Sequence, residues 1–174
     1  MRLRPATAGD ADAVAALHAD SWRRSYRGAL RDGYLDGDIV PERAALWRSR
    51  LTAPAADTHT ILAVDDASGG LLGFAHTIAD ADPDWGSLLD NLHVVHDRRR
   101  EGLGASLMRA TAAWVVGFAA RPVLHLWVLD ANAGARRFYE SLGAADVGGD
   151  VWEPPGGGAA PRRRYAWTDL SRLA

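Results

Sequence analysis

The most informative residues form a short turn, Arg99-x-x-Gly102-x-Gly104, between a strand-like segment and a helix-like segment. The backbone N–H groups at the start of a helix have no partner inside the helix, and the helix dipole adds partial positive charge there. Glycine lets the backbone approach an anion closely because it has no side chain, and Arg99 can donate charge-assisted hydrogen bonds. The turn therefore predicts a site for a phosphate or pyrophosphate group.

The glycines alone leave several interpretations open. A dinucleotide-binding fingerprint would need a third glycine at position 107, which is Leu107, and a P-loop needs a lysine, which the sequence lacks. An ordinary helix start with solvated arginines accounts for the same residues. A nucleotide-binding protein that uses the same turn is a further alternative.

The segments around the turn resemble the GNAT superfamily of N-acetyltransferases. In that family a Leu-x-Val strand precedes a turn of the form Gln/Arg-x-x-Gly-x-Gly/Ala. The sequence matches this pattern at five positions, Leu92, Val94, Arg99, Gly102 and Gly104.

A second sequence block of the same family, Asn…Ala…Tyr…Leu-Gly, resembles the segment 132–143, with Tyr139 at the tyrosine position. The sequence departs from the family pattern at Arg100, where glycine is common, and at His96 and Ala144. None of these changes removes a backbone donor from the turn, so the expected cofactor site is kept.

The resemblance implies that acetyl-CoA is the cofactor, used as a co-substrate. Its pyrophosphate is expected on the turn, and its pantetheine arm along the preceding strand as if it were an added strand. The expected contacts are Leu92, Val94, Arg99, Arg100, Gly102, Leu103, Gly104, Ala105 and Asn132. Arg136 or Arg137 is expected at the 3′-phosphate, and Arg136 is the first candidate of the two.

The same resemblance implies direct transfer of the acetyl group to an amine, without a covalent acyl-enzyme. Tyr139 is the expected general acid for the departing thiolate, because the phenol at this motif position lies beside the cofactor sulfur in the family. The general base stays open: Asp90 and His93 are the candidates, with His76 and Asp84 in reserve. Because strand side chains alternate, Asp90 and His93 are expected on opposite faces of their strand.

The acceptor is less well defined than the cofactor. The segment 21–28 and Tyr34-Leu35 resemble a branch of small-molecule acetyltransferases that includes bacterial spermidine acetyltransferases, which favours a primary amine of a small molecule. Aromatic rings beside Asp32, Asp36 and Asp38 would suit a cation. Polyamines, aminoglycosides, amino acids and protein N-termini all stay open, and the last would make the chain a protein N-terminal acetyltransferase. A non-catalytic GNAT-fold module that binds acyl-CoA in a regulatory role is an alternative of a different class.

The composition limits these interpretations. The formal net charge is −2 and all 20 basic residues are arginine, so nonspecific nucleic-acid binding is not expected. The sequence has no cysteine, and no pair of histidines has the helical spacing of a zinc site, so no metal is expected. No apolar run has the length of a membrane span, and the first residues do not form a secretion signal, which predicts a cytoplasmic protein without a membrane partner. The resemblance leaves a homodimer open.

Hydrophobic periodicity predicts the elements that position these residues. In chain order they are a strand at 3–5, helices over 8–25 and from Pro41 to Leu51, strands over 60–64, 71–78 and 87–95, a helix over 102–118, a strand over 122–128, a helix over 132–142 and two last strands around a Pro-Gly loop. This order predicts one domain, residues 1–174, with a mixed α/β (α+β) sheet. The resemblance specifies a GNAT fold, in which a mostly antiparallel mixed sheet of six to seven strands is flanked by about four helices.

Overall fold

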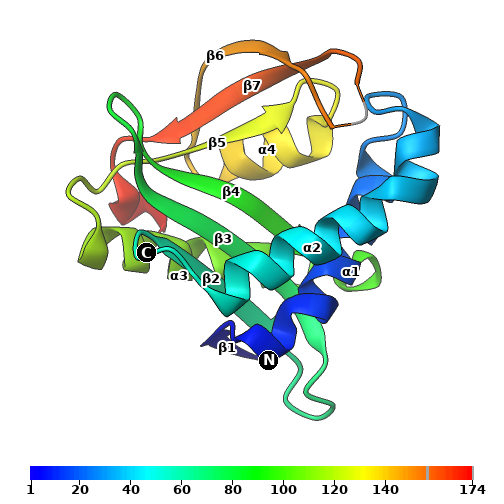
Figure 1. Cartoon of the computed structure of the whole chain (residues 1–174). Helices are drawn as coiled ribbons and strands as arrows, with labels where there is room; N and C mark the ends of the chain where they lie inside the picture. The colour runs from blue at the N-terminus through cyan, green and yellow to red at the C-terminus, as the bar shows by residue number, and fades with distance from the viewer. Residues whose placement is uncertain (156, 174) are drawn as a thin grey trace.

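One open sheet holds the chain together (Figure 1). The computed structural model describes residues 1–155 and 157–173, apart from the side chains of Asp38 and Arg172. In these residues seven strands pair in the order β1-β2-β3-β4-β5-β7-β6. Their bounds are β1 Arg2–Pro5, β2 Thr58–Val64, β3 Leu71–Asp82, β4 Gly86–Val94, β5 Leu124–Leu129, β6 Ala145–Trp152 and β7 Ala160–Trp167. Of the described pairs only β4–β5 is parallel, which confirms the expected mostly antiparallel mixed sheet.

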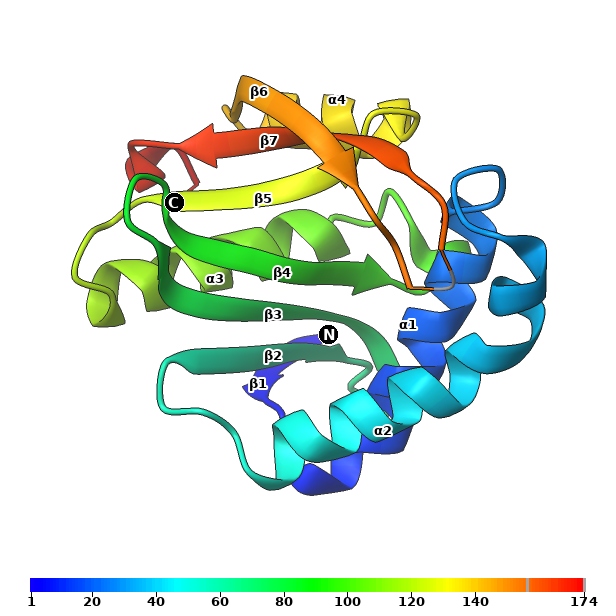
Figure 2. The same ribbon diagram turned by 45° about the horizontal axis from the view of Figure 1, so that its top comes forward.

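Helices cover both faces of the sheet. The long helices are α1 Ala11–Ser25, α2 Ile39–Thr52, α3 Leu103–Phe118 and α4 Ala133–Ser141. Figure 2 shows α1 and α2 on one face, and α3 and α4 on the other. None of the helices in the described part of the chain is long and apolar enough to cross a membrane.

Alternating strand residues supply a separate core to each helix layer. On β3, Phe74 packs with Trp47 of α2, whereas its neighbour Ala75 belongs to the cluster that contains Leu107 of α3. The side chains of Phe74, Trp47 and Leu107 are fully buried. Because successive strand residues point to opposite faces, this pattern fixes which face each residue of the neighbouring strand β4 presents.

The start of α2, the helix before β2, differs from the sequence expectation. The sequence predicts a start at Pro41, but α2 begins at Ile39 as a continuation of a π-helical turn, Tyr34–Asp38. The two segments merge because Ile39 already has helical backbone angles at the end of the π-turn. Pro41 is consequently an interior residue of one continuous helical segment, not its first helical position.

The sheet opens between its two central strands. Strands β4 and β5 pair only at their beginnings, where Ser87 lies opposite Leu124 and Leu88 opposite His125. Beyond these pairs, the two parallel strands diverge. The divergence leaves room for a ligand at the ends of β4 and β5, next to the N-terminus of α3.

Candidate active site

The turn between β4 and α3 leaves backbone donors free, as the sequence predicts. After the short 3-10 segment His96–Arg98, Gly102 caps α3 with a φ of 79°. The first hydrogen bond of the helix runs from the Ser106 N–H to the Gly102 carbonyl at 3.0 Å. The N–H groups of the residues between them, 103–105, precede any intrahelical acceptor, so they are available to an anion.

The two glycines of the turn have different structural roles. An added Cβ at Gly102 would meet nothing within 4 Å, but the positive φ favours glycine there. At Gly104 an added Cβ would lie 3.0 Å from Cζ of Phe138, so this glycine lets α3 and α4 approach each other. Arg100 has a positive φ of 69°, the conformation that glycine tolerates best.

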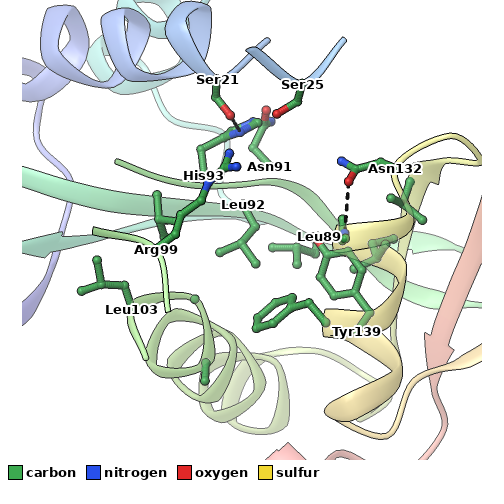
Figure 3. Close-up of a pocket in the computed structure, with 18 of the residues that line it drawn as sticks. Ser21, Ser25, Leu89, Asn91, Leu92, His93, Arg99, Leu103, Asn132 and Tyr139 are labelled. Carbon is green, nitrogen blue, oxygen red and sulfur yellow. Dashed lines mark hydrogen bonds between the residues drawn. The ribbon is translucent and has the colours of Figure 1, made fainter. Parts of the chain in front are cut away.

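A cavity of about 730 Å³ extends from the turn along β4 to α4. The turn residues Arg99, Arg100, Gly102, Leu103, Gly104 and Ala105 line it, together with Leu92, Val94, Asn132 and Tyr139. Figure 3 shows Leu92 directed toward Leu103 and Tyr139, and His93 directed the other way, toward Ser21. Cofactor residues proposed from separate sequence blocks thus meet around one cavity.

Arg136 does not lie in this cavity. Its guanidinium donates to the Asp130 carboxylate at 2.9 Å and to the Tyr165 hydroxyl at 3.3 Å, on the other side of α4. Its neighbour Arg137 lines the cavity instead. Successive residues of a helix are rotated by about 100°, so only one of the two can face the ligand. Of the two arginines expected at the 3′-phosphate, Arg137 is therefore the one that the structure places at the cavity, and Arg136 is not.

Asn132 caps the helix that carries Tyr139. Its side-chain oxygen accepts a hydrogen bond from the Ala135 N–H at 3.1 Å, and the cap fixes the start of α4 beside the cavity. Tyr139 is 9% exposed, and burial raises the pKa of its phenol well above the ordinary value. The phenol therefore stays protonated at neutral pH and keeps a proton that it can donate.

Asp90 and His93 face the same side of β4, contrary to the expectation from simple alternation. On β3, His76 pairs with Asn91 and Thr77 pairs with Leu89, so Asp90 is the extra residue of a β-bulge. A bulge shifts the alternation of side chains by one residue. The Asp90 carboxylate and the His93 ring consequently both reach the layer of α1 and α2.

His93 is held by a polar contact at the sheet surface. Its Nδ1 lies 2.8 Å from the Ser21 hydroxyl oxygen, and its ring lies 4.7 Å from that of the buried His18. Burial lowers the pKa of His93, Asp90 raises it, and Arg99 and Arg43 lower it, with a net pKa of about 4. The imidazole is therefore neutral at pH 7.

Asp90 is engaged by two neighbours. Its Oδ2 accepts a hydrogen bond from Arg50 of α2 at 2.8 Å and one from the Asn91 side-chain amide at 2.6 Å. The carboxylate is about 30% exposed. It lines the cavity described above and a second one on the face of α1 and α2.

The second cavity, of about 720 Å³, lies between these helices, the ends of β4 and β5, and the loop after β6. Seven residues line both cavities: Trp22, Tyr26, Leu89, Asp90, Asn91, Trp127 and Val128. Burial raises the pKa of the Tyr26 phenol to about 12, so it is neutral at pH 7. The two cavities meet where β4 and β5 separate.

The reserve candidates for a general base lie elsewhere. His76 is buried, with its Nδ1 2.7 Å from the Thr60 hydroxyl oxygen, and it lines neither cavity. Asp84 is in the turn between β3 and β4, also outside both linings. Of the carboxylates expected to attract a cationic acceptor, Asp32 and Asp36 are paired with Arg27 and line neither cavity. The side chain of Asp38, the third, lies outside the described part of the structure.

Sequence reasoning missed most of the second cavity. Arg43, Arg50, Trp127 and Trp152 come from three different elements and belong to no contiguous motif. Trp127 is the one partly exposed residue of β5, a pattern that only the structure reveals. Contacts between distant segments leave no local mark in the sequence.

Comparison with known proteins agrees with this architecture. Residues 16–144 match the acetyltransferase (GNAT) family. A protein of Bacillus subtilis (strain 168), described as uncharacterized N-acetyltransferase YuaI, is 26% identical over 98% of this chain and 95% of its own length. The crystal structure of PaiA N-acetyltransferase from Thermoplasma acidophilum in complex with coenzyme A has a TM-score of 0.71 at 16% identity, covering 95% of this chain and 98% of that one. The crystal structure of ribosomal-protein-alanine N-acetyltransferase from Brucella melitensis has a TM-score of 0.71 at 18% identity, covering 96% of this chain and 99% of that one.

Proposed function

The chain belongs to the acetyltransferase (GNAT) family and is an N-acetyltransferase, and on this premise we propose how it works. We propose that it transfers the acetyl group of acetyl-CoA directly to the primary amine of a small molecule. The observation that carries the proposal is the meeting of the two cavities at the separated ends of β4 and β5. A cofactor in the first cavity and an amine in the second would approach each other there without a covalent intermediate on the protein.

The residues around the first cavity fit coenzyme A. The open space beside Gly102 and the free N–H groups of residues 103–105 suit the pyrophosphate, with Arg99 and Arg100 adding positive charge. The backbone of Leu92 and Val94 is proposed to bind the pantetheine arm beside the diverging edge of β4. Asn132 is proposed to position the cofactor from the start of α4, and Arg137 to contact the 3′-phosphate.

Two proton transfers accompany the reaction. The amine nitrogen forms a bond to the thioester carbonyl carbon, the carbon–sulfur bond breaks, and the sulfur leaves as a thiolate. Tyr139 is proposed to give its phenolic proton to that sulfur, because it lines the first cavity and its phenol is protonated at neutral pH. The amine nitrogen loses a proton, for which the neutral His93 and the Asp90 carboxylate are the proposed acceptors.

A thiol-release assay with acetyl-CoA and a panel of amines tests this function. The panel contains polyamines, aminoglycosides, amino acids and peptides with a free N-terminus, and each product is identified by mass spectrometry. We expect release of coenzyme A that depends on a small amine. Turnover of peptides alone would instead make the chain a protein N-terminal acetyltransferase. Stabilisation by acetyl-CoA without turnover of any amine would favour a non-catalytic binding module.

A further inference from the structure

Three arginines line the outer part of the second cavity. If the amine reacts where the two cavities meet, as the proposed function requires, the rest of the acceptor must lie against residues that line the second cavity alone. The charged residues of that group are Arg43, Arg50, Arg162 and Glu153. Each of the three guanidiniums is also paired with a carboxylate, Arg43 with Glu42, Arg50 with Asp90 and Arg162 with Asp150, so the hydrogen-bond donors that these pairs leave free are more informative than the charge count.

Arg43 is the least satisfied of these arginines. It is 8% exposed, and its guanidinium lies 4.7 Å from the centre of the Trp22 ring. A guanidinium has five N–H donors. Among the described residues Arg43 has one hydrogen-bond acceptor, the Glu42 carboxylate, and its Nε–H is buried with none. The Nε–H is enclosed, so the donors that a ligand in the cavity can reach are the terminal N–H groups that do not bind Glu42. Polar groups in such a setting are normally hydrogen-bonded, and an anionic ligand group would satisfy them.

Neither of the other two arginines has a buried nitrogen without a partner among the described residues. Arg50 donates to Asp90 at 2.8 Å, and Arg162 binds Asp150 through two of its nitrogens, at 2.6 and 3.1 Å. Arg162 also stacks over Trp127, with 4.0 Å between its Cζ and the ring centre. These two residues therefore shape the cavity and add positive potential, which leaves Arg43 as the anchor for an anion.

The walls of the same cavity are aromatic. Trp22 and Trp152 meet edge to face with 5.9 Å between their ring centres, and Trp22 and Tyr26 lie 5.0 Å apart. Trp127 lines the cavity from β5. Such surfaces favour an apolar or planar group, because burying it removes apolar area from water.

We propose that the acceptor is an amine that also carries a carboxylate, such as an α-amino acid with an apolar side chain, and that Arg43 binds the carboxylate. This inference rests on the proposed function and narrows its substrate class. A planar carboxylate matches the fork of a guanidinium and can accept two of its N–H donors. The aromatic walls would then contact the side chain, while the amine lies near Asp90.

Matched amines test the role of the carboxylate. The thiol-release assay compares L-phenylalanine with 2-phenylethylamine, L-tryptophan with tryptamine, and both amino acids with spermidine. We expect kcat/KM for each amino acid to exceed that of its decarboxylated partner by about ten-fold or more, the range for a hydrogen bond to a charged group. A ratio of one or less, or a preference for spermidine, would overturn the inference while leaving the proposed function intact.

Two substitutions on α2 locate the effect. Arg43→Gln should bring the ratio for each matched pair close to one. Arg48→Gln, on the same helix and about 64% exposed at its side chain, should keep the wild-type ratio because Arg48 lines neither cavity. An unchanged ratio in Arg43→Gln would refute its role, provided that its thermal midpoint and its affinity for acetyl-CoA match the wild type. If Arg43→Gln does not fold, Arg43→Lys should lower the ratio while keeping the charge.

A binding measurement decides the outcome if no amine in the panel is turned over. Calorimetry with the CoA-loaded protein compares N-acetyl-L-phenylalanine with N-acetyl-2-phenylethylamine. Tighter binding of the carboxylated compound by about ten-fold supports the carboxylate site, even though the proposed transfer would then have failed. Equal binding of the two compounds would overturn the inference without reference to catalysis.

Discussion

Asp90 and His93 project from the same face of β4, although three positions separate them. The cause is the bulge at Asp90, where His76 and Thr77 of β3 pair with Asn91 and Leu89. The bulge places a carboxylate and a neutral imidazole in the same layer, beside the point where the two cavities meet. Both remain proposed proton acceptors for that reason.

Replacing Tyr139 with phenylalanine should slow the chemical step. Loss of a general acid lowers kcat by about 100-fold or more, whereas the affinity for acetyl-CoA should change little because the ring remains. Steady-state kinetics and calorimetric titration with CoA measure the two effects. Tyr165→Phe is the control, since Tyr165 is a buried neighbour whose hydroxyl donates to Glu140, outside the cavity. A Tyr139→Phe enzyme with wild-type kcat would eliminate Tyr139 as the acid.

Arg137 and Arg136 should respond differently to removal of the cofactor's 3′-phosphate. Arg137→Ala is expected to weaken CoA binding by about ten-fold and dephospho-CoA binding much less, because one charge-assisted contact is lost. Arg136→Ala removes contacts to Asp130 and Tyr165 and should leave both affinities near wild type. Calorimetry with the two ligands gives the comparison. The reverse order of effects would restore Arg136 as the phosphate contact.

Gly104→Ala should destabilise the protein through a clash between helices. The new methyl group would lie 3.0 Å from the Phe138 ring, and overpacking of this kind costs roughly 1–3 kcal/mol. Phe138→Leu in the same chain should recover part of the loss, because the smaller side chain makes room. Urea unfolding of both single variants and the double variant measures the coupling. If the changes in unfolding free energy of the two single variants simply add up in the double variant, the contact with Phe138 is not the cause of the destabilisation at position 104.

The pH dependence of activity should show no inflection from a histidine with an ordinary pKa. Burial lowers the pKa of His93 to about 4, so its proton-accepting form is fully present at pH 6 and above. We expect kcat/KM between pH 5.5 and 9 to rise with deprotonation of the amine, without an inflection near 6.5. His93→Gln should lower the whole profile without changing its shape. An inflection at pH 6.5 in the wild type that disappears in His93→Gln would contradict this assignment.

The stability of the fold should fall as the pH is lowered from 6.5 to 4. Between these values the unfolded chain protonates His93 and the folded protein does not, so unfolding takes up a proton and the unfolded state gains as the pH drops. From pH 7 to pH 5 the lowered pKa of His93 predicts a loss of about 2 kcal/mol in the free energy of unfolding. The lowered pKa of the buried His18 acts in the same direction. Urea unfolding at both pH values should give a smaller loss for His93→Gln, and an identical loss would exclude His93 as a source.

Much of the cofactor half could be predicted from the sequence because its parts are local. A strand, a glycine turn and the first turn of a helix follow one another within residues 92–105, and their backbone geometry depends mainly on nearby residues. The second block, at 132–143, is local in the same way, because one helix carries both its cap residue, Asn132, and Tyr139. The order of elements followed from hydrophobic periodicity and predicted the observed mixed sheet.

The sequence by itself determined the glycine turn before α3, the order of the elements and the resemblance to N-acetyltransferases. Tertiary structure alone decided which face Asp90 occupies, which of Arg136 and Arg137 reaches the cavity, and which residues surround the second cavity. A bulge depends on the register between two strands, and the side of a helix that faces a ligand depends on how the helix packs. Both are set by contacts between segments far apart in the chain, as when Arg43 of α2 and Trp127 of β5 line the same cavity.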